Sequence, residues 1–499
     1  MTEAMRRGGP AERCDVAVVG AGLPGLLSAT LLARDGAKVV LLDAARRPGG
    51  RLQTLGHQGF AIDVSPPLWE SEGLAEALAA AGAASPPLAL VVERRDVFAA
   101  VVEGGAVRGG AHPLPVPGAV PSPAVLGAVA DLLGAKPRTW AMLGEACAEL
   151  LAADDGAAVD SPGPAAPAGT LAEWASSRGL EPAVTAALLR SAELLGAAGP
   201  SVASARRVAR RLRSLASGAA AFVAPAQHAI AGARGLVDAL VDAAVAAGVE
   251  TRLGTRVLSL EVERGRLRGL VLQREELPFL ATLEADRVVI AVPPAEASRL
   301  LPPEFRPTLA PAAGSLLGFA FGLRSAPWPQ DAPPPPALRL VRPPGAPGSP
   351  AAPGAPGAPI LVAAPQAHAP GVAPPGQGLL LAYAPVADAH LDAGELRRLA
   401  MLVRSAVLDL HPGAEVGWER SWFRAGEAID PFADPTWPEA LTDLAGVRFA
   451  GWSVRLARCV TSGPSAAAAS AVAAASSLRS TSQPSPEGGV SLGRPRRSG

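Results

Sequence analysis

Cysteine and lysine are scarce in this chain. Its 499 residues include three cysteines, Cys14, Cys147 and Cys459, and two lysines, Lys38 and Lys136. Cysteines so few and so far apart exclude a disulfide framework and a zinc site, so we expect no bound metal. The two lysines leave few candidates for any reaction that needs an amine side chain.

Long apolar runs and an excess of one charge are also missing. No charge-free run of about 18 strongly apolar residues is present to span a membrane. Residues 1–12 carry basic side chains but no apolar core of a signal peptide, so we expect a cytoplasmic protein. The 45 basic and 45 acidic residues cancel, which argues against a nucleic-acid partner. With 49% hydrophobic residues, the chain has enough apolar content for two or three domains.

The most informative segment is a strand–turn–helix–strand pattern near the N-terminus. The apolar run 15–19 predicts a buried parallel strand, and 39–42 predicts a second one. Between them, the glycines of the sequence GAGLPG allow a tight turn, close approach of a pyrophosphate and close packing of the helix. Asp43 follows the second strand, where its carboxylate can accept hydrogen bonds from a ribose. The pattern therefore predicts a dinucleotide site that includes Gly20, Gly22, Leu23, Gly25 and Asp43.

A second glycine turn, Arg46 to Arg51, follows directly with the sequence RRPGGR. Together with the first turn, it resembles FAD-dependent oxidoreductases of the amine oxidase, protoporphyrinogen oxidase and phytoene desaturase superfamily. The resemblance implies that Gly50 exposes backbone N–H groups to the FAD pyrophosphate, and that Arg47 and Arg51 supply positive charge. The alternative for Arg51 is a solvated loop residue. The segment 59–63 resembles the next strand of the family, with Ser65 where a glycine is common.

Two later segments extend the resemblance. Residues 233–240 predict a helix, and 257–262, 267–273 and 286–292 predict strands in the order of the returning half of these flavoproteins. That order implies that backbone near Val257 contacts the adenine. Residues 447–451 resemble the last sheet strand, which ends in Gly451. Thr461 and the alanine-rich stretch beyond it resemble the final helix, whose N-terminus faces the flavin.

The sequence departs from the family pattern at two places. Trp452 stands where an acid commonly follows the glycine, and Arg458 and Cys459 stand where the family commonly has Gly-Ala. Arg458 is the candidate catalytic residue: beside the flavin it would either stabilise the anionic reduced form or crowd the ring. These departures leave open a flavin-binding homologue without turnover.

The predicted fold is α/β, with a Rossmann-like FAD-binding domain built from separated segments and interleaved with a mixed helix/sheet substrate domain. We expect the FAD-binding domain at 13–63, 225–297 and 441–479, and the substrate domain at 64–224 and 298–440. A Pro/Ala/Gly-rich insertion near 326–378 is expected to be an inserted loop. Residues 1–12 are expected to be flexible and 480–499 to be a disordered tail.

The resemblance implies transfer of hydride from a substrate C–H bond to flavin N5, with oxygen or a quinone as the electron acceptor. The amine oxidases of the superfamily use a lysine near N5, and neither lysine of this chain matches it. We therefore favour an apolar substrate, with desaturation of a carotenoid or isoprenoid polyene ahead of protoporphyrinogen-type or amine oxidation.

Three further features carry weaker expectations. The predicted helix Arg206–Arg213 is basic and amphipathic, and either contacts an anionic membrane surface or packs its apolar side into the core. Trp418, Trp422 and Trp437 either form a wall over the flavin or pack in the core. His228 is a candidate proton donor, although a lone histidine is more often structural.

Overall fold

The structure is a computed structural model of the whole chain, and it describes most of the residues between Glu12 and Ser480. The described ranges are 12–65, 69–70, 74–83, 88–91, 97–103, 106–113, 137–152, 169–185, 188–189, 204–205, 208–209, 226–229, 232–274, 280–307, 315–325, 338–342, 360–367, 370–386, 392–409, 411, 413–424, 437–441, 443–451 and 463–480.

A seven-stranded sheet includes β1 at the start of the described chain. Its order is β10-β2-β1-β13-β12-β11, and β19 pairs with β13 beside β12. The strands β1, β2, β10, β13 and β19 run parallel, so their carboxyl ends meet at one edge. The bounds are β1 Glu12–Val19, β2 Val39–Leu42, β10 Glu250–Arg252, β11 Thr255–Glu263, β12 Arg266–Arg274, β13 Leu280–Ile290 and β19 Val447–Phe449.

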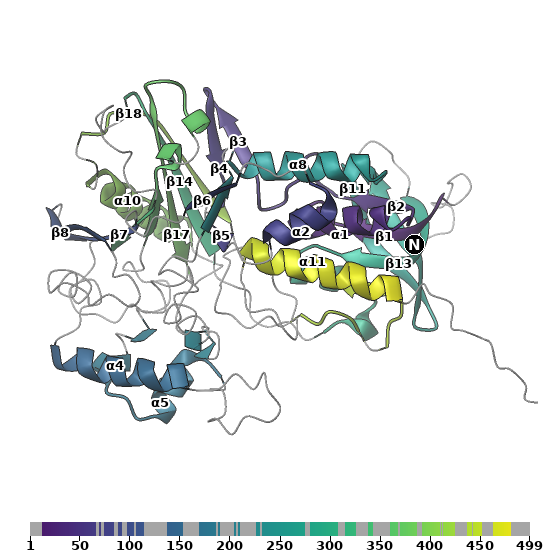
Figure 1. The fold of residues 1–499 in the computed structure, drawn as a ribbon, viewed down its shortest axis with the longest axis horizontal. Helices are drawn as coiled ribbons and strands as arrows, with labels where there is room; N and C mark the ends of the chain where they lie inside the picture. Colours follow the sequence, from purple (N-terminus) through teal and green to yellow (C-terminus); the bar gives the residue numbers. More distant parts are fainter. Residues whose placement is uncertain are drawn as a thin grey trace, which may run out of the picture.

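Helices from distant parts of the chain cover one face of this sheet (Figure 1). They are α1 (Leu23–Arg34), α2 (Leu74–Ala81), α8 (Gly232–Ala246) and α11 (Gly463–Ser480). Alanines of α11 pack against α1 because their small side chains allow the two helices to approach closely. The other face packs against α9 (Pro294–Leu300) and Trp437.

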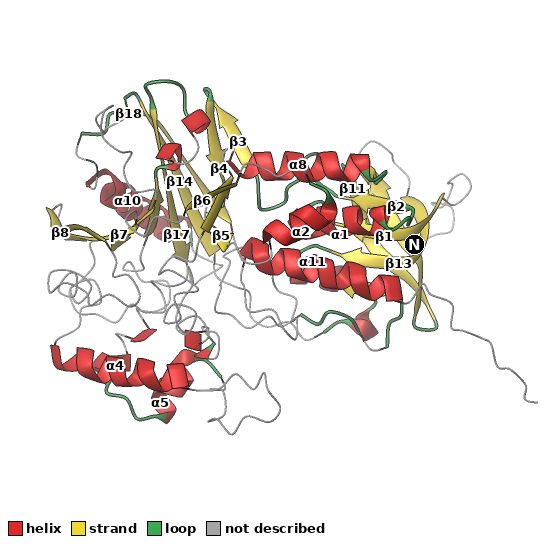
Figure 2. Cartoon of the chain, viewed as in Figure 1, coloured by secondary structure: helices red, strands yellow, loops and turns green. Residues whose placement is uncertain are grey.

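A second sheet of seven strands lies at the other end of the molecule (Figure 2). Its order is β18-β14-β17-β16-β15-β7-β8, and α10 (Ala393–Asp409) packs its buried side against it. All nine residues of β14 are buried, which explains its nearly continuous apolar sequence. The bounds are β7 Val97–Glu103, β8 Ala106–Pro113, β14 Ser315–Leu323, β15 Leu338–Arg342, β16 Ile360–Ala363, β17 Gly378–Val386 and β18 Val416–Arg424.

The prediction of an inserted loop at 326–378 is wrong for part of that segment, because β15 and β16 lie in it and belong to the second sheet. β15 pairs in parallel with β7, and β16 pairs with β17. Two short 3-10 helices, η3 (Pro365–Ala367) and η4 (Pro370–Val372), follow β16. The sequences of β15 and β16, LRLVR and ILVA, have the β-branched and apolar content of strands. They are short and are surrounded by Pro, Ala and Gly, so the composition of the whole segment did not indicate them. The rest of the segment up to residue 359 lies outside the described residues.

Smaller elements connect the two sheets. A hairpin of β3 (Thr54–His57) and β4 (Phe60–Asp63) follows the second glycine turn. A three-stranded sheet joins β5 (Trp69–Glu70), β9 (Ala226–Ala229) and β6 (Leu88–Val91). A separate helical cluster contains α4 (Pro137–Ala152) and α5 (Leu171–Ser177), and η2 (Pro303–Phe305) follows α9.

The predicted basic helix is described only in part. Val208 is buried in the helical cluster, which agrees with the alternative that the helix packs its apolar side into the core. All the arginines of Arg206–Arg213 lie outside the described residues. Of the predicted flexible ends, Glu12 already belongs to β1 and Ser480 closes α11; the rest lies outside the described residues. Within the described part of the chain, no helix is long and apolar enough to cross a membrane.

Candidate functional site

The two glycine turns meet at the carboxyl ends of β1 and β2. Gly22 and Gly49 form a parallel bridge, and the Gly49 N–H donates to the Ala21 carbonyl at 2.8 Å. Gly50 lies against Gly22, because a Cβ built on Gly50 would stand 3.2 Å from the Gly22 Cα. Two motifs that are separate in sequence therefore form one surface of backbone at the start of α1.

Two glycines of the first turn are required by the fold itself. Gly20 has a φ of +104°, and a Cβ there would lie 2.6 Å from the Ala291 carbonyl oxygen. A Cβ on Gly25 would overlap the Gly20 carbonyl oxygen, so α1 could not pack this close to the turn. These are the tight-turn and close-packing roles that the glycine spacing predicts.

At Gly22, by contrast, the fold itself does not require a glycine. Its φ of −77° and ψ of −179° suit any residue, and a Cβ there would meet no atom closer than 3.8 Å. The space beside it is open, at a helix N-terminus that has no side-chain cap and no acid in its first turn. Unpaired helix N–H groups and the helix dipole favour an anion at such a place. This open backbone surface fits a pyrophosphate.

Asp43 faces the same turn from the end of β2. Its Oδ2 accepts from the Ala21 N–H at 2.6 Å and its Oδ1 accepts from the Ala45 N–H at 2.7 Å. A carboxylate has about four acceptor positions, so both oxygens retain capacity for ribose hydroxyls. The Asp43 carbonyl accepts from the Thr255 N–H at 2.8 Å, which brings the start of β11 and Val257 to this end of the sheet. The Val257 side chain is buried in the core beneath the sheet, which leaves its backbone for contact.

The remaining described site residues lie around these turns. Leu23 is buried at the first turn of α1, Arg47 is exposed in the loop after β2, and Arg51 is partly buried after Gly50. Trp452, Arg458, Cys459 and Thr461 lie outside the described residues, so their assignments stay predictions. The side chain of His228 also lies outside the described residues, although its backbone belongs to β9.

The end of β19 is held by a serine that sequence reasoning missed. Gly451 donates its N–H to Ser470 Oγ at 2.7 Å, and this hydroxyl donates to the Ala467 carbonyl at 2.9 Å. Ser470 is fully buried, and a Cβ on Gly451 would meet no atom within 4 Å. The signal was present in the sequence, because Ser470 interrupts an otherwise apolar stretch of a helix that packs in the core.

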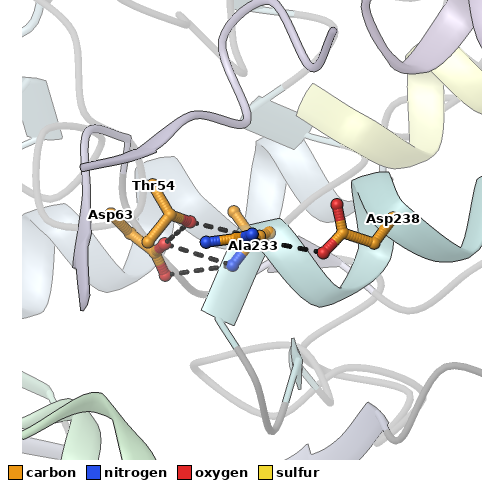
Figure 3. Close-up of polar contacts among 5 residues, drawn as sticks. Thr54, Asp63, Ala233 and Asp238 are labelled. Carbon is orange, nitrogen blue, oxygen red and sulfur yellow. Dashed lines mark hydrogen bonds and ion pairs between the residues drawn. The ribbon is translucent and has the colours of Figure 1, made fainter. Parts of the chain in front are cut away.

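Asp63 is a second residue whose role the sequence did not reveal (Figure 3). Both carboxylate oxygens accept from the Ala233 N–H at the start of α8, at 3.1 and 3.2 Å. The Thr54 hydroxyl donates to Oδ1 at 2.6 Å and itself accepts from the Arg234 N–H. Burial raises the pKa of Asp63 to about 6, although these hydrogen bonds act in the opposite direction. Asp63 thus caps α8 and ties it to the β3–β4 hairpin.

Comparison with known proteins agrees with this fold. A solved oxidoreductase from Methanosarcina mazei matches with a TM-score of 0.62 at 16% identity, over 92% of this chain and 99% of that one. Cyclohexylamine oxidase from Brevibacterium oxydans IH-35A matches with a TM-score of 0.57 at 17% identity, over 93% and 99%. At this identity the two structures show a common fold only.

Two curated relatives, both hydroxyneurosporene desaturases, match over short segments. Hydroxyneurosporene desaturase from Cereibacter sphaeroides is 51% identical over 51 residues, and the match spans 10% of this chain and 10% of the relative. The model of the family described as flavin containing amine oxidoreductase matches residues 23–470. That range begins at α1, partway through the first glycine turn, includes the second turn and ends at Ser470, whose hydroxyl accepts a hydrogen bond from Gly451. The chain therefore belongs to the flavin-containing amine oxidoreductase family and is an FAD-dependent oxidoreductase with the α/β fold of that family.

Proposed function

We propose that this enzyme oxidises an apolar small molecule by removing hydride from a C–H bond, and that desaturation of a carotenoid or isoprenoid polyene is its reaction. The bound flavin supplies the hydride acceptor, and oxygen or a quinone then takes the electrons. The short match to a hydroxyneurosporene desaturase supports this substrate class. Protoporphyrinogen-type oxidation is the next candidate, since its substrate is also largely apolar.

The protein residues bind and orient the cofactor in this proposal. Gly22, Gly50 and the N-terminus of α1 hold the pyrophosphate with Arg51, and Asp43 holds the ribose of the adenosine half. The backbone near Val257 contacts the adenine. The open space beside Gly22 supports this assignment, because no protein atom explains the missing side chain there.

The observation that carries the apolar substrate is the composition of three neighbouring strands of the second sheet. Its strands β14, β16 and β17 contain no charged residue. A substrate with one or more ammonium groups needs carboxylates to replace its lost hydration, and these three neighbouring strands provide none. A polyene needs only an apolar surface.

The position of Lys38 further lowers the case for amine oxidation. This lysine precedes β2, and its backbone N–H donates to Asp15 at 2.8 Å. It therefore lies at the amino end of β2, whereas both glycine turns lie beyond the carboxyl ends of β1 and β2. The second lysine, Lys136, lies outside the described residues.

The test is anaerobic reduction of the purified holoenzyme, followed by the visible absorbance of the flavin. An acyclic conjugated polyene in detergent micelles should bleach the flavin, and oxygen or a soluble quinone should restore its colour. A porphyrinogen and a primary alkylamine serve as the two competing substrates. Rapid bleaching by the amine alone would establish amine oxidation instead. No bleaching by any of the three, in protein that dithionite still reduces, would favour a flavin-binding homologue without turnover.

A further inference from the structure

Two tryptophans of β18 form a matched pair. Trp422 pairs directly across from Gly318 of β14, and Trp418 pairs across from Gly322. A Cβ on either glycine would overlap the facing indole, so both rings lie across β14 on the same side of the sheet. Their N–H groups differ. Nε1 of Trp422 donates to the Val64 carbonyl at 3.0 Å, whereas Nε1 of Trp418 is buried without a hydrogen-bond partner among the described residues.

The acceptor belongs to the turn 63–65, which is bonded to distant segments through three consecutive residues. The Tyr383 hydroxyl donates to the Asp63 carbonyl at 2.8 Å, and Trp422 donates to the next carbonyl along the chain. The Ser65 hydroxyl then donates to the Arg51 carbonyl at 2.8 Å. The first two donors come from the second sheet, and the third bond reaches the second glycine turn.

Tyr383 and Val64 of this connection are buried, and Trp422 is half-buried with its ring against that of Tyr383. Tyr383, the one tyrosine of the chain, is 1% exposed, and its ring meets that of Trp422 edge-on at 6.2 Å. Both rings contribute to the apolar cluster that joins β14 and β17 to the β3–β4 hairpin. A buried carbonyl without a hydrogen-bond donor costs free energy. The donors Tyr383 and Trp422 therefore fix the position of the turn 63–65.

We propose that Tyr383 and Trp422 are positioning residues for the cofactor. They fix the turn 63–65, and through the Ser65 hydroxyl that turn sets the position of the Arg51 backbone at the FAD pyrophosphate. The second sheet thereby controls how tightly the phosphate loop binds, without touching FAD. The inference rests on the proposed assignment of Gly50 and Arg51 to the pyrophosphate.

The experiment compares Trp422→Phe with Trp418→Phe in the full-length holoenzyme. Both changes remove the same indole atoms opposite a glycine, but only the first removes a hydrogen bond. FAD dissociation constants are measured by dilution and flavin fluorescence, and ADP affinity by displacement of FAD. We expect Trp422→Phe to weaken the binding of both FAD and ADP about tenfold, which corresponds to the loss of one partly buried hydrogen bond. Trp418→Phe should stay within about twofold of the wild type, which is the error of such a comparison.

ADP is the decisive probe because it carries the pyrophosphate but no flavin ring. If Trp422→Phe weakens FAD and leaves ADP unchanged, the turn acts at the ring and the proposal is overturned. The same conclusion follows if the two tryptophan variants behave alike. Tyr383→Phe retains its ring, removes the second donor and should reproduce the loss, so the test survives if Trp422→Phe does not fold.

Arg51→Ala separates this proposal from the site assignment beneath it. If Arg51→Ala leaves ADP affinity unchanged, the pyrophosphate assignment is wrong. If it weakens ADP while Trp422→Phe does not, the assignment stands and the positioning role is overturned. When Trp422 acts through Arg51, the double variant should bind ADP no more weakly than Arg51→Ala alone. Fully additive losses would show that the two residues act independently.

Discussion

Asp63 has two structural roles. Its side chain caps α8, and its backbone carbonyl accepts a hydrogen bond from Tyr383 of the second sheet. At 3% exposure the ionised form loses most of its hydration, and burial raises the pKa of Asp63 to about 6. The folded protein therefore binds this proton more tightly than the unfolded chain does. The resulting stability is fully present below the unfolded pKa and is lost as the pH rises through about 6.

We predict that the Asp63→Asn variant does not show this loss of stability as the pH rises through about 6. Asparagine is as good a helix cap as aspartate and has no ionised form, so the variant should fold. Between pH 4 and pH 7, the free energy of unfolding of the wild type should fall relative to the variant by about 2.5 kcal/mol, for a shift of roughly two pKa units. Urea unfolding at several pH values measures this difference.

The comparison with Asp63→Asn removes the contribution of other acids. Glu173 and Asp392 are exposed carboxylates whose pKa values are lowered by backbone hydrogen bonds, so their effect on stability has the opposite sign. Both residues are present in the wild type and in the variant, and their contributions cancel in the difference. Parallel curves for the two proteins would mean that burial does not suppress ionisation of Asp63.

The β1–α1–β2 unit offers the sharpest test at the scale of elements. We predict that Gly22→Val leaves this unit folded, because its backbone angles suit valine and no atom lies within 3.8 Å of the added Cβ. The branched side chain should nevertheless fill the pyrophosphate space and weaken FAD by roughly a hundredfold or more, about 2.7 kcal/mol. Flavin content per protein and far-ultraviolet circular dichroism measure the two effects separately.

Gly56→Val is the matched control for this prediction. Gly56 is an exposed residue of β3, and a Cβ there would meet no atom within 4 Å. It lies outside the glycine turns, so the variant should keep its flavin. Equal flavin content in Gly22→Val and Gly56→Val would place the cofactor elsewhere.

The elements that the sequence predicted well are those with local signals. The glycine spacing, the acid after β2 and the β-branched run before Pro293 predicted β1, α1, β2 and the end of β13, because each element follows from neighbours in sequence. The parallel pairing of β15 with β7 joins segments far apart in the chain, and no local pattern contains that information. Short strands inside a Pro/Ala/Gly-rich stretch were missed for the same reason.

The residues of the candidate site also differ in whether a local sequence pattern identifies them. The glycines and Asp43 could be named from their spacing, whereas the roles of Ser470, Trp422 and Tyr383 depend on which distant backbone atom each faces. A hydroxyl or an indole N–H carries no signature in sequence that identifies a carbonyl or amide on another element. Such residues become visible only when the positions of the buried acceptors are known.

At the scale of the whole molecule, the proposed flavin site brings together segments from both ends of the chain. The turns after β1 and β2, the start of β11 and the end of β19 lie on one sheet but come from three separated parts of the sequence. A ligand that contacts all of them binds the folded state and not the unfolded chain. At a hundred times its dissociation constant, such a ligand adds about 2.7 kcal/mol to the free energy of unfolding.

We therefore predict that the purified protein is yellow, and that FAD raises its melting temperature while riboflavin, which lacks the pyrophosphate and the adenosine, raises it little. Denaturation should release the FAD, because the cysteines described are unsuited to a covalent bond: burial raises the pKa of the Cys14 and Cys147 thiols to about 11, which keeps them protonated. Differential scanning fluorimetry and the absorbance of the supernatant after acid precipitation provide the measurements. Flavin that stays with the precipitate would indicate a covalent link, for which Cys459 is the remaining cysteine. Folded protein that has no flavin and gains none on incubation with FAD would contradict the cofactor site, because the open space beside Gly22 would then have no ligand to explain it.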